Sequence, residues 1–345
     1  MKKIIFIALI VFSFFASCKN QDIDFPDYDY TAVYFPYQSP VRTLVLGTDY
    51  DYDNSVDTTH QCIIYATMGG VYSNNVDRKL DVVVDNSLCN KLSFESATGG
   101  AVLPMPANYY TLPSNQITIP AGSMMGGLKV QLTDAFFADP LAVKNTYVIP
   151  LRITKVANAD SILCGVPNVA TPNRLISTDW KTLPKDYVLF VVKYKNPWDA
   201  VYLRRGIEEG KGNNGNTALD TTVVYHKKYV EYDQVVSSVA SQSINQLLIS
   251  LSGKNKGNND APFNLLLTFN NDGNCSITNP ASASYSITGS GKYVKNGDMW
   301  GNKKRDVLYL KYQVNFGTTT HSMTDTLVMR DRAEKFETFN PYYNK

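Results

Sequence analysis

The chain has 345 residues, of which 44% are hydrophobic and 19% are charged. This length is enough for two domains of average size, and the composition supports packed cores and excludes extensive disorder. The 33 basic and 31 acidic side chains give a formal charge of +2. That balance excludes a dedicated nucleic-acid-binding protein, because such proteins concentrate basic residues on one face.

The first seventeen residues have the layout of a secretory signal. Two lysines precede the apolar run 4–16, which is shorter than the about 20 apolar residues that span a membrane. The run leads into Ala16, Ser17 and Cys18, two small residues before a cysteine, as in the bacterial lipobox. We therefore expect cleavage before Cys18 and lipidation of its thiol and new amino group. Several acyl chains would hold the protein firmly on a membrane. A plain signal peptide with a chance cysteine is the alternative.

Residues 18–29 are polar and are expected to form the tether between the lipid and a folded body. Residues 30–185 are then expected to form one all-β sandwich, because short β-rich segments alternate with Pro, Gly, Asn and Asp. One short helical turn is expected at 133–137. The expected strands are residues 32–35, 44–46, 62–65, 80–84, 117–119 and 147–153.

Residues 186–345 are expected to form a second domain, which begins with the strongly apolar segment 187–194. Short polar connections between successive strands favour an antiparallel meander, and closing it into a barrel would remove the exposed edges. A second sandwich is the alternative. The expected strands are residues 187–194, 200–204, 221–232, 245–251, 264–269, 285–294, 307–316 and 325–329.

Four further cysteines, Cys62, Cys89, Cys164 and Cys275, allow three disulfide pairings, and the sequence cannot choose among them. Buried cysteines without bridges are the preferred interpretation. No pair has the C-x-x-C spacing of a zinc or redox site, and the three histidines are scattered. We expect no metal and no cofactor.

The acidic residues do not form a recognisable catalytic set. Glu208 and Glu209 would point to opposite faces of a strand, whereas glycoside hydrolysis needs two carboxylates in one cleft. These two residues, like Glu334 and Glu337, are interpreted as solvated. His321 lies beside Ser322 without a G-x-S-x-G motif. We therefore expect a protein that is not an enzyme.

A calcium loop is a weaker alternative for the acidic segment after residue 48. Calcium loops need glycine at position six and glutamate at position twelve, but the chain has Asn54 and His60 there. A solvated acidic loop is preferred. The acidic residues of the segment are Asp49, Asp51, Asp53 and Asp57.

Aromatic residues give the one positive indication of a ligand. The chain has 23 tyrosines, 15 phenylalanines and three tryptophans, and amphipathic rings suit a partly wet binding surface. Trp300, Tyr293 and Trp198 lie in or beside polar, turn-rich segments, so we expect them to contact a ligand. Alternatively, Trp198 packs against Arg330 and closes one end of a barrel.

Several segments resemble a family of two-domain lipoproteins from Bacteroidota. They are residues 33–43, 106–112, 145–151, 193–198, 202–206 and 300–306. The resemblance implies an immunoglobulin-like N-terminal sandwich and a lipocalin-like C-terminal barrel. It also implies a place in polysaccharide-utilisation systems, with an outer-membrane glycan importer as candidate partner.

Two functions follow from the residues and the resemblance together. The first is a non-catalytic, surface-tethered carbohydrate-binding lipoprotein of the outer membrane, facing the cell exterior. The acidic residues of the tether resemble, weakly, the export signal of such surface proteins. The alternative is a lipocalin-like carrier that holds a small apolar ligand or a lipid inside the barrel.

Overall fold

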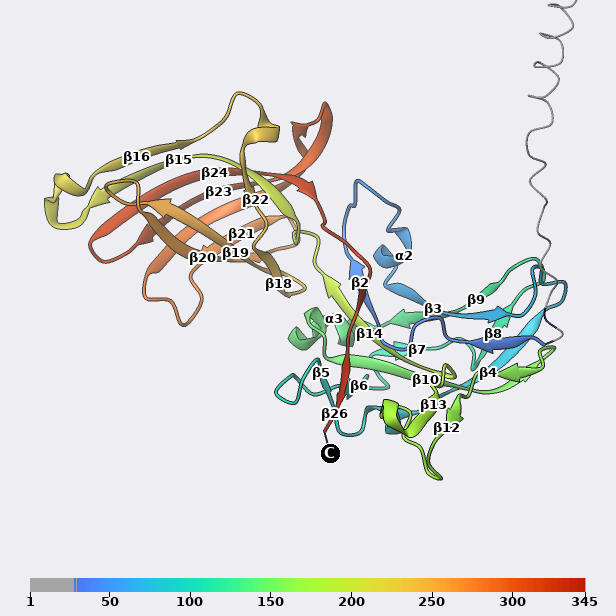
Figure 1. The fold of residues 1–345 in the computed structure, drawn as a ribbon. Coiled ribbons are helices and arrows are strands. Elements are labelled where there is room, and N and C mark those ends of the chain that lie inside the picture. Colours follow the sequence, from blue (N-terminus) through green and yellow to red (C-terminus); the bar gives the residue numbers. More distant parts are fainter. Residues whose placement is uncertain (1–27, 29, 345) are drawn as a thin grey trace, which may run out of the picture.

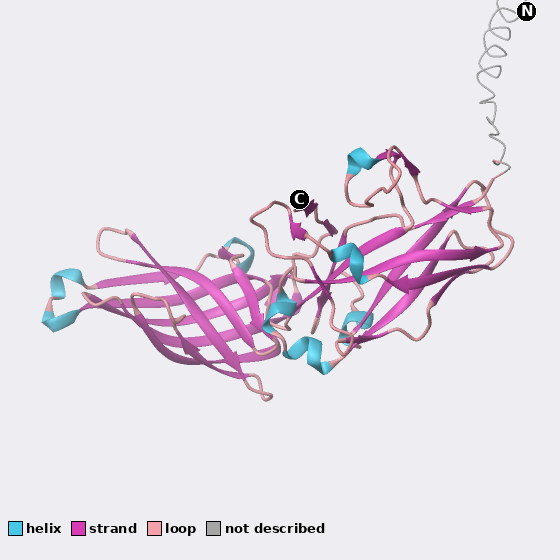
Figure 2. Cartoon of the chain, turned by 90° about the horizontal axis from the view of Figure 1, so that it is seen from below, coloured by secondary structure: helices cyan, strands magenta, loops and turns pink. Residues whose placement is uncertain are grey.

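The computed structural model describes residue 28 and residues 30–344. The signal, Cys18 and the rest of the tether apart from residue 28 lie outside these residues. Two bodies made almost entirely of strands lie side by side (Figure 1), and short helical turns occur only in their connections (Figure 2). Among the described residues, no helix is long and apolar enough to cross a membrane.

The N-terminal body is a sandwich of a five-stranded and a seven-stranded sheet. Val33, Ile64, Ile149 and Val192 lie in the shared core, from which solvent is excluded. The first sheet has the order β11 (Ser161–Ile162), β1 (Ala32–Tyr34), β3 (Gln61–Gly69), β9 (Met125–Leu132) and β7 (Tyr110–Thr111). The second has the order β25 (Glu337–Thr338), β2 (Pro40–Val45), β14 (Tyr187–Lys195), β10 (Tyr147–Ala157), β4 (Arg78–Val84) and β8 (Gln116–Ile119), with β6 (Leu103–Pro104) beside β10.

The expected domain boundary between residues 185 and 186 is misplaced, because β14 belongs to the sandwich. It runs parallel to β2 and antiparallel to β10. Phe190 and Val192 face the core between the sheets, while Leu189 and Val191 pack in a second cluster on the outer side. Burial on both faces explains why this segment is continuously apolar rather than alternating. The barrel domain therefore begins after Lys195.

The end of the chain returns to the sandwich. β26 (Pro341–Tyr343) pairs with β5 (Leu92–Phe94), and β12 (Val166–Pro167) pairs with β13 (Trp180–Thr182). Phe339 packs on Phe94 in the outer cluster.

The short α-helices are α2 (Ser55–Thr58) and α3 (Asp134–Ala138). The second confirms the helical turn expected at 133–137.

The C-terminal body is a curled antiparallel sheet of ten strands. β17 pairs with β15 while β18, three residues further along the chain, pairs with β19. One short segment thus joins the two ends of the sheet, which favours the barrel over a second sandwich. The strands are β15 (Val201–Gly212), β16 (Thr221–Tyr225), β17 (Gln234–Val236), β18 (Val239–Ser243), β19 (Gln246–Lys254), β20 (Asp260–Phe269), β21 (Asn274–Thr278), β22 (Ser286–Trp300), β23 (Lys303–Asn315) and β24 (Thr319–Asp331).

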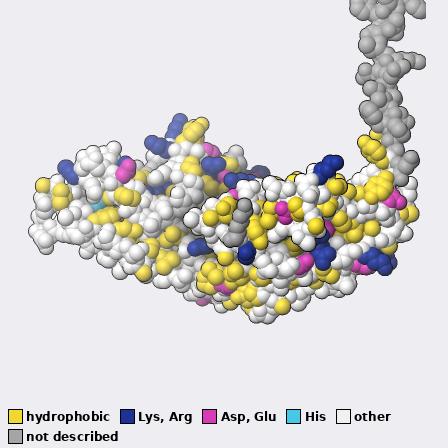
Figure 3. All heavy atoms as spheres, turned by 60° about the horizontal axis from the view of Figure 1, so that its bottom comes forward, with side chains coloured by type: hydrophobic (Ala, Val, Ile, Leu, Met, Phe, Trp, Pro, Cys, Tyr) yellow, Lys and Arg dark blue, Asp and Glu magenta, His cyan; other side chains and the backbone are white. Residues whose placement is uncertain are grey.

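The all-β class, with a sandwich followed by a curled antiparallel sheet, is confirmed. The four cysteines that the structure describes are free; Cys62, Cys89 and Cys275 are buried, as expected, but Cys164 is exposed. On the side of the molecule shown in Figure 3, hydrophobic side chains are denser over the sandwich than over the barrel. Positive and negative side chains are intermixed on this face.

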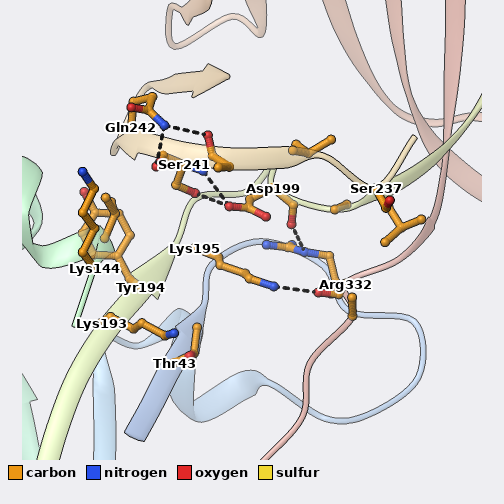
Figure 4. Close-up of a pocket in the computed structure, with 16 residues that line it drawn as sticks. Thr43, Lys144, Lys193, Tyr194, Lys195, Asp199, Ser237, Ser241, Gln242 and Arg332 are labelled. Atoms are coloured by element: carbon orange, nitrogen blue, oxygen red, sulfur yellow. Dashed lines mark hydrogen bonds between the residues drawn. The ribbon is translucent and has the colours of Figure 1, made fainter. Parts of the chain in front are cut away.

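Two chain segments cross from sandwich to barrel, and Arg332 joins them. Its guanidinium is buried and donates to the carbonyl oxygens of Leu46 (2.9 Å), Asn196 (2.8 Å) and Asp199 (2.8 Å). Figure 4 shows Arg332 and Lys195 beside a hollow of about 280 Å³ between the two bodies. Because backbone groups of both bodies share one cation, the joint has a defined geometry.

Candidate ligand-binding site

The end of the barrel nearest the sandwich carries an open hollow of about 730 Å³. Four segments meet around it: the linker after β14 and three regions of the barrel that are distant in sequence. This volume is in the range typical of ligand sites. The lining residues are Pro197, Trp198, Ile244, Asn245, Phe269, Asn270, Asn271, Asp272, Gly273, Tyr293 and Lys295.

Aromatic rings form the apolar part of the hollow. Trp198 stacks on Phe269 with ring centroids 3.8 Å apart and planes only 8° from parallel. Tyr293 meets Trp198 edge to face, with a centroid separation of 6.3 Å. Proline cannot donate a hydrogen bond to a strand ladder. The chain therefore leaves β14 just before Pro197, and Trp198 follows in the turn. Two of the three aromatic residues predicted from the sequence are thus brought together.

Polar side chains form the rim of the hollow, and tight turns present them. The side-chain oxygen of Asn270 accepts the backbone N–H groups of Asp272 and Asn274, both at 3.0 Å. Such a side-chain-to-backbone turn leaves the residues at its tip exposed, here Asn271 and Asp272. The sequence reasoning missed these rim residues, although the Asn-Asn-Asp-Gly turn between two strands was a usable signal.

A buried carboxylate accepts a hydrogen bond from Tyr293, which lines the hollow. The hydroxyl of Tyr293 donates to Asp306, which is completely buried. Burial, followed by the hydrogen bond to Asp306, raises the pKa of Tyr293 above its ordinary value. Tyr293 therefore stays a neutral hydrogen-bond donor at physiological pH.

Trp300, the third aromatic residue predicted to contact a ligand, is not among the residues that line the hollow. It packs at the edge of a separate small cluster with Leu203 and Val328. The guanidinium of Arg305 lies over its ring, 4.8 Å from the centroid. The sequence surroundings of Trp198 and Trp300 are similar, but Trp198 lies in the turn after β14 and Trp300 ends β22.

The alternative contact between Trp198 and Arg330 is also not the one observed. Arg330 forms a 2.8 Å ion pair with its neighbour Asp331 at the surface, and Trp198 stacks on Phe269 instead. The buried arginine in this region is Arg332, which follows the end of β24 and donates to the carbonyl oxygens of Asn196 and Asp199.

Comparisons with known proteins agree with this architecture. A crystal structure from Bacteroides ovatus, described as structural genomics of unknown function, is 38% identical to this chain. The match covers 92% of this chain and 100% of that one, with a TM-score of 0.84. The chain belongs to the same family.

Two family models match the chain, one within each of the two bodies. The model described as a domain of unknown function (DUF5627) matches residues 197–333, which is the barrel. A second model, described as an N-terminal domain, matches residues 28–160 of the sandwich. No curated protein matches the chain.

Two further Bacteroides ovatus structures match over most of their length but overlap poorly. One, of unknown function, is 15% identical, covers 89% of this chain and 99% of that chain, and has a TM-score of 0.41. The other, whose description proposes carbohydrate binding, is 11% identical, covers 90% and 99%, and has a TM-score of 0.28. Overlaps this poor carry no inference for this family member.

The interior of the barrel contains a buried ionic network. Arg204 and Asp325, both inaccessible to solvent, form a 2.9 Å ion pair. Asp325 also accepts the Tyr312 hydroxyl at 2.6 Å, and Tyr225 stacks under the Arg204 guanidinium. Because every charge has a partner, the pair is tolerated without solvent.

Glu208 lies in the same network, which corrects its interpretation as a solvated residue. It is buried, whereas Glu209 is exposed, so the two point to opposite faces as expected. Glu208 bonds His321 (2.6 Å), the Tyr225 hydroxyl (2.5 Å) and the Lys254 N–H (2.8 Å). Burial alone would raise the pKa of Glu208, but these hydrogen bonds lower it below its ordinary value.

The other acidic residues noted in the sequence have structural partners. Glu334 and Glu337 form ion pairs with Lys195 (2.7 Å) and Lys193 (2.8 Å) of β14. These contacts attach the returning C-terminal segment to the sandwich. Both glutamates were expected to be solvated, and these ion pairs correct that expectation.

Three of the four aspartates of the candidate calcium loop have hydrogen-bond partners within the protein. Asp49 and Asp53 accept backbone N–H groups of their own turns. Asp57 is buried and paired with Arg42, so it does not lie in a solvated loop. Within the described part of the chain, no three acidic, histidine or cysteine side chains form a group suited to a metal ion.

Proposed function

We propose that this protein is a non-catalytic carbohydrate-binding lipoprotein, and that the hollow at the barrel end is its binding site. One observation supports the proposal most directly: a hollow of about 730 Å³ combines an aromatic floor with a rim of amides and opposite charges.

The chemistry of the lining suits a sugar. The C–H faces of a pyranose pack on aromatic rings, which Trp198 and Tyr293 supply, and ring hydroxyls need both donors and acceptors. Asn245 and Asn271 carry both groups. Lys295 and Asp272 balance each other in charge, so the site favours neutral sugars over strongly ionic ones.

The location of the protein is part of the same proposal. Cys18 in its lipobox would anchor the chain to the outer membrane, with the folded body facing the cell exterior. An outer-membrane glycan importer is the proposed partner. Capture without cleavage would then keep a glycan close to its point of entry.

The second function considered, a carrier of an apolar ligand inside the barrel, is less well supported. Side chains such as Leu247, Leu265 and Leu308 are fully buried in the barrel core. The Arg204–Asp325 pair lies in the same interior. An apolar guest is better accommodated by an entirely apolar interior than by one that contains a buried ion pair.

A glycan array followed by calorimetry tests the proposal. The purified chain should retain at least one neutral polysaccharide, and Asn271→Ala and Lys295→Met should weaken that retention. Matched controls are Asn90→Ala on the sandwich and Lys256→Met at the opposite barrel end, both exposed positions. Absence of retention across plant and host polysaccharides, or turnover of the bound glycan, would contradict the proposal.

A further inference from the structure

A single buried carboxylate connects the sandwich to the proposed binding site. Asp306, on β23, is completely buried and accepts hydrogen bonds from both bodies of the molecule. The Tyr50 hydroxyl, from the sandwich, donates to its Oδ1 at 2.7 Å. The Tyr293 hydroxyl, from the wall of the hollow, donates to its Oδ2. The two tyrosines are thus linked through one side chain.

Tyr50 belongs to the loop between β2 and α2, which reaches from the sandwich onto the barrel. Its hydroxyl accepts the backbone N–H of Asp306 at 2.9 Å while it donates to the side chain. The guanidinium of Arg305 lies 4.2 Å from the centre of its ring. Burial, followed by the bond to Asp306, raises the pKa of Tyr50, so the hydroxyl stays protonated.

The same carboxylate fixes an irregularity in β22. The register of β22 against β23 shifts between Val294 and Asp298, and Asn296 has a left-handed φ of 54°. The Asn296 N–H, which the strand ladder does not use, donates to Asp306 at 2.9 Å. A β-bulge re-aims the side chains around it. Here the bulge carries Lys295, which lines the hollow next to Tyr293.

From these contacts we infer that Tyr50 is a positioning residue for the binding site, so that the sandwich shapes a site in the barrel. Tyr50 is not among the residues that line the hollow. It acts through Asp306, whose orientation sets both the Tyr293 ring and the bulge that presents Lys295. The inference rests on the proposed function for its role in binding, but the positioning itself is independent of any ligand.

The test compares Tyr50→Phe with Tyr52→Phe in the full chain. Both replacements remove one hydroxyl from the same loop, but Tyr52 is 44% exposed. The first measurement is the ¹⁹F spectrum of protein labelled with 5-fluorotryptophan. The Trp198 signal, assigned with Trp198→Phe, should shift in Tyr50→Phe because Trp198 contacts Tyr293. Trp180, in the sandwich, serves as the internal reference.

The second measurement is calorimetric titration with cellohexaose, xylohexaose, maltohexaose and mannohexaose. For each probe that the wild type binds, Tyr50→Phe should weaken binding about 3- to 10-fold. This is less than the full worth of a hydrogen bond to a charge, because Tyr50 acts on the ligand only through Asp306 and Tyr293. Tyr52→Phe should bind as the wild type does. Combining Tyr50→Phe with Tyr293→Phe should cost less than the two separate losses together, because both act through one carboxylate.

The outcomes separate the two proposals. An unchanged Trp198 signal in Tyr50→Phe overturns the positioning role, whatever the titrations show. A shifted signal with unchanged affinity for a bound probe also overturns the link to binding. A shifted signal in a protein that binds none of the four probes supports positioning and counts against the carbohydrate assignment.

Discussion

The two ends of the barrel use similar side chains for different purposes. In the middle and at the end remote from the sandwich, Arg204, Asp325 and Glu208 are buried among tyrosine rings and have their hydrogen-bond partners inside the protein. At the end nearest the sandwich, Asn271, Asp272 and Lys295 surround Trp198 and remain exposed. Aromatic rings with polar neighbours are therefore not sufficient evidence of a binding site.

The difference lies in which partners the polar groups already have. A buried charge must be paired inside the protein, because no water can replace the partner. An exposed amide at a turn keeps its hydrogen-bonding capacity for a ligand. The comparison predicts large effects on stability from the buried set and large effects on binding from the rim.

The largest expected effect on stability comes from Asp325→Ala. Arg204 would remain buried without its carboxylate, which typically costs about 3–5 kcal/mol. Urea unfolding measures the change. The matched control is Asp260→Ala, which breaks the ion pair with Lys254 at the surface. The control should change stability little; equal losses in both variants would contradict the distinction between buried and exposed pairs.

Arg332→Met is expected to have the next largest effect. It would leave the carbonyl oxygens of Leu46, Asn196 and Asp199 without their charged donor. We expect a loss of about 3 kcal/mol, given 1.5–3 kcal/mol for a hydrogen bond to a charged group. Small-angle scattering should also show looser coupling of the two bodies. A wild-type scattering profile in this variant would show that Arg332 does not set the joint.

Glu208 makes part of the stability dependent on pH. Its pKa is lower in the folded chain than the ordinary 4.5. The ionised form therefore stabilises the fold above the unfolded pKa, and this contribution is lost as the pH falls through the folded pKa. Between about pH 6 and pH 3.5, the wild type should lose more stability than Glu208→Gln. Urea midpoints at both pH values measure this, and equal losses would exclude the contribution.

Lys295→Met should change stability least, within about 0.5 kcal/mol, because the side chain is exposed. Its effect should appear in glycan retention instead. Thermal unfolding and calorimetry on the same preparation measure both quantities. A variant that is strongly destabilised would mean that the rim has a structural role like that of the buried network.

Strand positions were largely predictable from local pattern. Turn residues and short β-rich segments located β3, β10, β19 and β23, and the short helical turn expected at 133–137 is α3. The assignment of β14 to the barrel was wrong. Its strand character is local, but its parallel pairing with β2 joins segments about 150 residues apart in the chain.

The binding-site residues were predictable only in part. Trp198 and Trp300 both follow polar, turn-rich segments, yet one lines the hollow and the other packs on Arg305. Which one faces the hollow depends on the curl of the sheet and on the bulge in β22. Neither is a property of the residues adjacent to the tryptophan.

By itself the sequence determined the all-β class, the order of the two bodies and most strand positions, because turn preferences and side-chain alternation act over a few residues. The tertiary structure alone decided which charges are buried, where the domain boundary lies and which aromatic rings meet. Those outcomes depend on register and on contacts between distant segments, such as Tyr50 with Asp306. A one-residue change of register would send every side chain of a strand to the opposite face.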